Sequence, residues 1–410
     1  MSPTSPAATR VAGVDAARGI ALLGMMATHI VPLAVSTADG AYATTWAADW
    51  FAGRASALFA VLAGVGLALL TGGAAGPTAA RLAGARRSVV VRALVIAAIG
   101  LACGTLSTNV AVILVHYGLL FLAAVPFLGA RPRTLLLWAV GWTLVSPALL
   151  YGAGLWLASS PLGPVLSLPG GGAAPTFSDL ASPAALAANL LVSGYYPVVV
   201  WVSFLLIGLW AGRLRLQHPP VVLLLAVGGA VVAAGARLLS DWLLGVPGAR
   251  PALADAMGVD AAQLELALRT GYYFDATEPT PWWFALAAPH TSAPLDLLHV
   301  AGSALAVLGA CQLVALGLTA VLQRFGDVVL SPLTGAGAAT LTLYVGHLVA
   351  LDLLSGVTEA VSAERVFAWF AVSALALGAA LRLTGARGPL EALVRQLAGS
   401  PRTGARAGSR

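Results

Sequence analysis

The chain has 410 residues, of which 59% are hydrophobic and only 9% charged, and its mean hydropathy is +0.89. Soluble domains are about one quarter charged, so this composition excludes a soluble globular protein and indicates one that crosses a membrane repeatedly. The net charge of +6 does not indicate nucleic acid as a partner, because the arginines are spread over short loops and both tails.

Apolar stretches of about 20 residues, the length that a spanning helix needs, recur along the chain. We predict an all-α polytopic membrane protein, with both termini cytoplasmic because arginine-rich loops alternate along the sequence. We expect the protein to lie in the lipid bilayer of the inner (plasma) membrane. The ten predicted spans are 14–35, 51–71, 88–107, 109–128, 134–158, 187–212, 220–245, 294–322, 333–356 and 363–384.

One transmembrane domain is predicted over residues 1–398, followed by a disordered basic tail at 399–410. Two outer loops are long, at 159–186 and 246–293. The second contains ADAMGVDAAQLELALRTG, which predicts a short amphipathic helix. Small residues in GAGAATLTLY, Gly335 to Tyr344, predict close packing between helices.

The first predicted span carries three ionisable residues, Asp15, Arg18 and His29. Such groups cost a few kcal/mol each inside a membrane, so they normally face the protein interior. Asp15 and Arg18 are three residues apart and share a helix face at the cytoplasmic end. Together with Arg92 in the third span, they could hold a phosphorylated ligand. The alternative is that the basic residues serve only as positive-inside anchors.

Histidines gather in the predicted outer half of the bundle, where five of the six lie. Asp296 precedes His299 by three residues on one helix face, and a carboxylate that holds an imidazole ring is a common support for a general base. The alternative for each histidine is a hydrogen-bonded structural residue. A metal site is not predicted, because no HxxxH or HExxH spacing is present. The members of this outer group are His29, His116, His290, His299, His347, Arg54 and Asp296.

The predicted bundle thus has a basic inner mouth and a histidine-rich outer one. This arrangement suits an enzyme that takes one substrate from each side. It also suits a transporter or flippase that uses the same polar column, with the histidines relaying protons.

Four segments carry a family resemblance. DAARGIALLGMMATH, ending at His29, resembles the opening signature of YeiB-like membrane proteins and of the heparan-alpha-glucosaminide N-acetyltransferase family. FAGRASALFAVLAGVGLAL (51–69) resembles their second span. LSPLTGAGAATLTLYVGH (330–347) and RGPLEALVR (387–395) resemble the YeiB-type C-terminal half, here at about 220–398.

The resemblance implies a ten-span acyltransferase that moves an acetyl group from cytoplasmic acetyl-CoA to an extracytoplasmic glycan or small-molecule acceptor. We predict no metal cofactor, and a homodimer is a possible assembly. His29 falls where the sugar acetyltransferase has a site Asn. That enzyme also uses a histidine in its first outer loop, whereas residues 36–50 here contain none. Three alternatives follow: His29 takes that role, another segment supplies it through His290, His299 or His347, or the protein no longer acetylates.

The expected roles follow from this resemblance and from the topology. His29, His299, Asp296 and His347 are the candidate catalytic residues, and Asp15, Arg18 and Arg92 would bind acetyl-CoA. The acceptor would meet the remaining candidates, which are Arg54, His116, His290, Tyr344 and Trp283.

Overall fold

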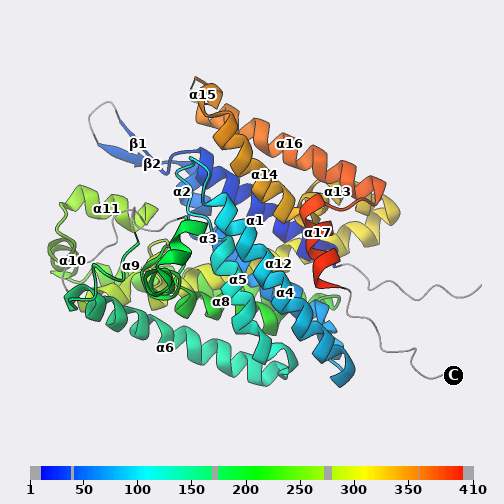
Figure 1. The fold of residues 1–410 in the computed structure, drawn as a ribbon, viewed down its shortest axis with the longest axis horizontal. Coiled ribbons are helices and arrows are strands. Elements are labelled where there is room, and N and C mark those ends of the chain that lie inside the picture. Colours follow the sequence, from blue (N-terminus) through cyan, green and yellow to red (C-terminus); the bar gives the residue numbers. More distant parts are fainter. Residues whose placement is uncertain (1–10, 38–40, 169–173, 272–278, 359, 400–410) are drawn as a thin grey trace, which may run out of the picture.

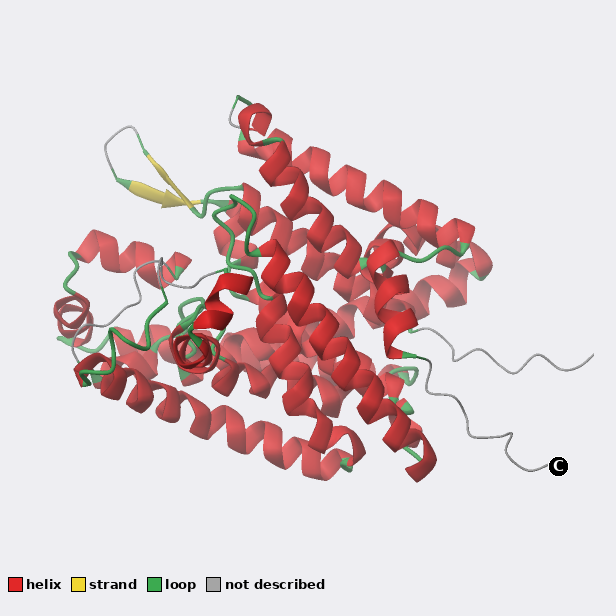
Figure 2. Ribbon diagram, viewed as in Figure 1, coloured by secondary structure: helices red, strands yellow, loops and turns green. Residues whose placement is uncertain are grey.

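The computed structural model describes residues 11–37, 41–168, 174–271, 279–358 and 360–399 and consists of helices with one small hairpin (Figures 1 and 2). The predicted tail at 399–410 therefore lies outside the described residues, apart from Gly399. The longer helices are α1 (Ala12–Ile30), α3 (Arg54–Leu70), α4 (Ala79–Cys103), α5 (Leu114–Ala124), α6 (Pro132–Ser159), α8 (Val198–Ala211), α9 (Pro219–Leu244), α12 (Pro294–Leu322), α13 (Arg324–Ala338), α14 (Thr340–Leu353) and α16 (Ala363–Thr384).

Shorter elements join these helices. The hairpin pairs β1 (Ala34–Ser36) antiparallel with β2 (Tyr42–Thr44). The short helical elements are α2 (Trp46–Phe51), η1 (Gly73–Ala75), η2 (Val125–Gly129), η4 (Phe177–Ala181), α7 (Pro183–Ala188), η5 (Asn189–Ser193), α10 (Ala249–Met257), α11 (Ala261–Thr270), η6 (Pro281–Ala285), α15 (Ser355–Thr358) and α17 (Pro389–Ala398).

Five helical segments of the described chain are long and apolar enough to cross a membrane, and the number rises to seven if each of two bent pairs is one span. The bent pairs are 183–193 with 198–211, at 56°, and 331–338 with 340–353, at 83°. Helices α1, α4 and α5 form where other spans were predicted, outside that count. The chain is thus an all-α membrane protein, while the ten-span count and the cytoplasmic termini stay predictions.

Helix α1 lies within the bundle against α3, α12, α13 and α16. Glycines allow α13 to approach both α1 and α16 closely. A Cβ atom on Gly337 would come 1.7 Å from the Asp15 carbonyl oxygen, and one on Gly335 would come 1.9 Å from the Gly378 carbonyl oxygen. Both glycines belong to the small-residue segment that predicted close packing, so that prediction is confirmed.

A carboxylate from the end of the chain holds the bend between α13 and α14. Glu391 of α17 accepts hydrogen bonds from the backbone N–H groups of Leu341 and Thr342, at 2.7 and 3.1 Å, and from the Thr342 hydroxyl at 2.6 Å. These are among the N–H groups that a helix start leaves without intrahelical partners. The RGPLEALVR segment therefore fixes the first turn of α14, the helix that carries Tyr344 and His347.

The described part of the loop predicted at 246–293 forms a small core with Leu244 of α9 and Tyr151 of α6. This core lies at the end of the bundle opposite α17 (Figure 1). The predicted amphipathic segment is confirmed as helical, but Gly258 at φ +64° divides it into α10 and α11. Trp283 is buried in this core with its ring stacked 5.0 Å from Tyr151. It supports the loop and lines none of the cavities described below.

Candidate functional site

A cavity of about 290 Å³ lies beside the N-terminal half of α1. Arg18 and Arg92 line it, and both were expected to bind the donor. An ion pair of 3.1 Å joins Arg18 to Asp15, and a longer contact of 3.4 Å leads from Arg18 to the Leu62 carbonyl oxygen. Gly66 makes room for the guanidinium, because a Cβ there would lie 2.5 Å from Arg18 Nη2. The other walls are largely apolar and aromatic, with Tyr117 and Tyr344 among them.

A second cavity, of about 400 Å³, lies at the C-terminal end of α1. His29 lines it together with Tyr195, Tyr196 and His290. The His290 ring is 4.3 Å from the Tyr195 ring, centroid to centroid. Because His290 is buried in the loop before α12, its pKa is lowered from 6.5 to about 4. This wall therefore presents a neutral imidazole and two phenol rings to the cavity.

Two histidines and a tyrosine stand where these cavities approach each other. His29 Nδ1 lies 2.9 Å from His347 Nε2, and the two rings are nearly parallel, at 12°. Tyr344, one helical turn before His347, meets the His347 ring edge-on at 5.1 Å and the His29 ring at 6.2 Å. Tyr344 lines the first cavity and His29 the second. A chain of three side chains thus joins them.

The close contact between the imidazoles limits their protonation. One nitrogen must carry the hydrogen and the other must accept it, so the pair cannot be doubly protonated in this geometry. We assign the hydrogen to His29 Nδ1, which leaves His29 Nε2 free to accept a proton on the side of the second cavity. His29 and His347, 318 residues apart in sequence, form a shared proton site of the kind that general-base catalysis uses.

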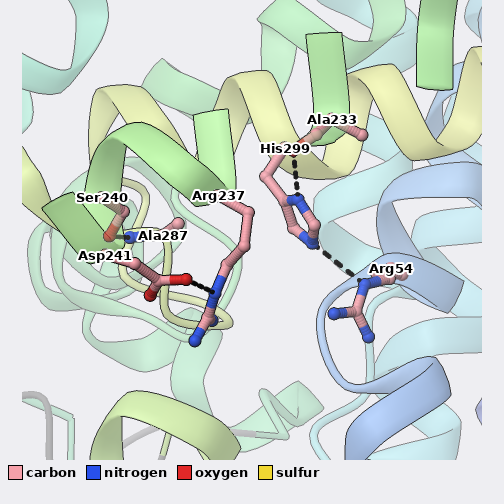
Figure 3. Close-up of polar contacts among 7 residues, drawn as sticks. All are labelled: Arg54, Ala233, Arg237, Ser240, Asp241, Ala287 and His299. Carbon is pink, nitrogen blue, oxygen red and sulfur yellow. Dashed lines mark hydrogen bonds and ion pairs between the residues drawn. The ribbon is translucent and has the colours of Figure 1, made fainter. Parts of the chain in front are cut away.

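His299, Asp296 and Arg54 lie elsewhere, around a third cavity of about 180 Å³. His299 Nε2 accepts a hydrogen bond of 3.1 Å from Arg54 Nε, and His299 Nδ1 lies 2.9 Å from the Ala233 carbonyl oxygen (Figure 3). Both ring nitrogens are therefore occupied by groups other than Asp296. The spacing that placed Asp296 and His299 on one face is real, yet it does not produce the predicted carboxylate–imidazole pair.

Asp296 instead holds the loop that carries His290. Its Oδ2 accepts a hydrogen bond of 3.0 Å from the Ser292 backbone N–H. His290 and Ser292 both have positive φ, 61° and 55°, a conformation that non-glycine residues rarely adopt. The buried carboxylate stabilises this conformation and so fixes where His290 faces the second cavity.

The remaining predicted residue, His116, is fully buried, and its ring meets Tyr196 edge-on at 5.5 Å. It therefore stands behind the second cavity and does not line it. Sequence reasoning missed Tyr195 and Tyr196, whose signal was a tyrosine pair just before Pro197 at a helix break. It also missed Arg237 and Arg269, which line the third cavity. Arg237 had a readable signal, since it lies inside the predicted span 220–245.

Comparison with known families gives one match. The profile described as heparan-alpha-glucosaminide N-acetyltransferase, catalytic, matches residues 10–238, which is more than half of the chain. The matched range includes Asp15, Arg18, His29 and Arg92, whereas His347 and Tyr344 lie beyond it. No individual curated protein matches the chain.

Proposed function

The chain belongs to the heparan-alpha-glucosaminide N-acetyltransferase family, and we propose that it is a membrane acetyltransferase whose substrates enter from opposite sides. Acetyl-CoA binds in the Arg18 cavity, and an extracytoplasmic sugar or other hydroxyl or amine acceptor binds in the His29 cavity. The observation that carries the proposal is the contact between His29 and His347, where these two cavities approach each other. The plasma membrane is the proposed location.

The donor side has the chemistry that acetyl-CoA requires. Guanidinium groups bind phosphates through charge-assisted hydrogen bonds, and Arg18 and Arg92 line the cavity, with Arg395 close enough to repel Arg92. A volume of about 290 Å³ is at the small end of ligand pockets, which span roughly 300–1,000 Å³. The cavity therefore suits the acetyl thioester and the end of the pantetheine arm, with the nucleotide at its mouth beside the arginines.

The acceptor side offers aromatic faces and neutral hydrogen-bonding groups. Tyr195 and Tyr196 present rings to the cavity, and Thr28 and Asn109 also line it. Its volume of about 400 Å³ falls within the usual range for small-molecule sites. One sugar ring with its reacting hydroxyl or amine beside His29 is the occupant that we propose.

The reaction then follows from the paired imidazoles. His29 Nε2 takes the proton from the acceptor hydroxyl or amine, while His347 Nε2 accepts the hydrogen bond from His29 Nδ1 and stabilises the resulting imidazolium. The acceptor atom forms a bond to the thioester carbonyl carbon, and the carbon–sulfur bond breaks with its electron pair on sulfur. The thiolate takes the proton that His29 held and leaves as free CoA.

The test is acetyl transfer by the purified full-length chain with labelled acetyl-CoA and a panel of hexosamines and hexoses. Removing a general base typically costs about 10²–10⁴ in rate, so we expect His29→Ala to lower kcat by at least about a hundredfold. His347→Ala should lower kcat and shift its pH profile. His218→Ala is the matched control, because His218 is exposed before α9. A His29→Ala variant with full activity would refute the assignment.

The transporter reading of the same polar column is not favoured, because the matched family is one of acetyltransferases. The distinguishing measurement is movement of a labelled sugar across proteoliposomes that contain no acyl donor. We expect none above that of protein-free vesicles.

A further inference from the structure

We propose that the third cavity, walled by Arg54, Arg237, Arg269 and His299, is a binding site for a phosphate group that keeps a P–OH hydrogen. The cavity has a volume of about 180 Å³. Its arginines come from three separate helices, α3, α9 and α11. The transfer reaction proposed above uses none of these side chains.

Each arginine has donor groups to spare. Arg54 uses Nε for His299 and Nη1 for the Asp49 carbonyl oxygen, which leaves Nη2. Arg237 uses Nε in a 3.2 Å ion pair with Asp241, and both of its Nη groups remain (Figure 3). Arg269 has no hydrogen bond to any residue in the described ranges. Guanidinium groups in such a cluster match the oxygen atoms of a phosphate or a carboxylate.

Two of the arginines also lie close to each other. Arg54 and Arg237 are close enough to repel each other, and arginines within spanning helices normally have a partner or a function. Two carboxylates also face the cavity and attract Arg54, so they offset part of its positive charge. Both accept hydrogen bonds from other groups. Asp49 accepts from the Thr44 hydroxyl at 3.0 Å, and Asp296 Oδ2 accepts from the Ser292 N–H at 3.0 Å. A bound oxyanion would relieve the repulsion between the two arginines.

Asp296 Oδ1 indicates which class of anion the cavity binds. Asp296 is 3% exposed, lines the cavity, and its Oδ1 accepts no hydrogen bond from the described chain. A buried acceptor without a donor is costly, so the ligand should supply one. Inorganic phosphate keeps at least one P–OH group near neutral pH, and a phosphate monoester keeps one below a pKa of about 6. Sulfate and the phosphodiester of a lipid headgroup have none.

The experiment measures binding of ³²P-labelled inorganic phosphate to the purified full-length chain at pH 6.5. We expect saturable binding that a tenfold excess of sulfate does not displace. Arg237→Gln and Arg269→Gln should each weaken it by about tenfold or more, because each removes charge-assisted hydrogen bonds. Arg250→Gln is the matched control, since Arg250 pairs with Glu265 and does not line the cavity.

Further experiments distinguish a soluble phosphate from the headgroup of an anionic lipid. In nanodiscs, exchanging phosphatidylcholine for phosphatidylglycerol should leave phosphate affinity unchanged. Competition by the anionic lipid would overturn the assignment to a soluble phosphate. Asp296→Asn should make sulfate an effective competitor, because the amide can donate to it. Absence of phosphate binding, or wild-type affinity in both the Arg237 and Arg269 variants, would overturn the site. None of these measurements involves acetyl transfer. They therefore test the phosphate site independently of the proposed enzyme activity.

Discussion

Removal of the Glu391 carboxylate tests how the position of α14 affects stability and activity. Glu391 lies on α17 and touches neither histidine, yet it accepts three hydrogen bonds at the start of α14. Glu391→Ala would leave two backbone N–H groups and the Thr342 hydroxyl without this acceptor. Glu391 also lines the Arg18 cavity, so the KM for acetyl-CoA must be measured separately from kcat. Tyr344 and His347 follow within the next two turns of the same helix.

The magnitude follows from these contacts. A hydrogen bond to a charged group contributes about 1.5–3 kcal/mol, but loss of a helix cap costs only about 0.5–2 kcal/mol because water replaces part of it. Glu391 is half-buried, so we expect about 2 kcal/mol of destabilisation. For a chain of 410 residues this lowers Tm by about 2 °C. Displacement of α14 by a fraction of an ångström would lower kcat by roughly tenfold to a hundredfold.

The assay is thermal unfolding of the purified chain combined with acetyl-transfer kinetics. Glu391→Gln keeps one carbonyl oxygen for the two N–H groups, so it should retain most of the stability and activity. Glu364→Ala is the control, because Glu364 is an exposed acidic residue in the first turn of α16. If Glu391→Ala left both Tm and kcat unchanged, or if the Gln and Ala variants behaved alike, the positioning role would be refuted.

Two other predictions concern single side chains in the cavities. Gly66→Ala should raise KM for acetyl-CoA several-fold with little loss of stability, because its Cβ would meet the flexible end of Arg18 at 2.5 Å. Gly141→Ala, on an open face of α6, should change neither quantity. The His290 pKa of about 4 is depressed below the unfolded value of 6.5, so its contribution to stability is complete above pH 6.5 and is lost as pH falls toward 4. His290→Gln should flatten the fall in Tm over that window, and an unchanged pH profile would contradict the buried neutral ring.

The sequence predicts the helices well because the signal is local. Apolar stretches of about 20 residues locate α6, α9, α12 and α16, and a helix in a membrane satisfies its own backbone. The break at Ala339 is different, because the span predicted there, 333–356, reads as uninterrupted. The donors freed by the 83° bend are met by Glu391, about 50 residues later in the chain. No local pattern encodes that partner.

The candidate site likewise contains features that the sequence predicts and features that it does not. Placing His29 and His347 in one half of the bundle needs only topology, and they are indeed in contact. The pairing of Asp296 with His299 relied on helix spacing, but spacing sets only which face a residue occupies. Arg54 and the Ala233 carbonyl group, from two other helices, take the His299 nitrogens, while the neighbouring loop takes Asp296. Contacts with other helices and with the neighbouring loop therefore determine which groups bond to His299 and Asp296, and the spacing along one helix does not.

We propose that His347 takes the role of the histidine that residues 36–50 lack. The family resemblance implies two polar site residues on the outer side, one at the position of His29 and a histidine from the first outer loop. Here that loop contains the β1–β2 hairpin, and the second imidazole next to His29 comes from α14. A histidine on a helix whose first turn is fixed by Glu391 is held more firmly than one on a loop. In the proposed mechanism, the proton site would form before the acceptor arrives, and acceptor binding would need only to fill the cavity beside His29.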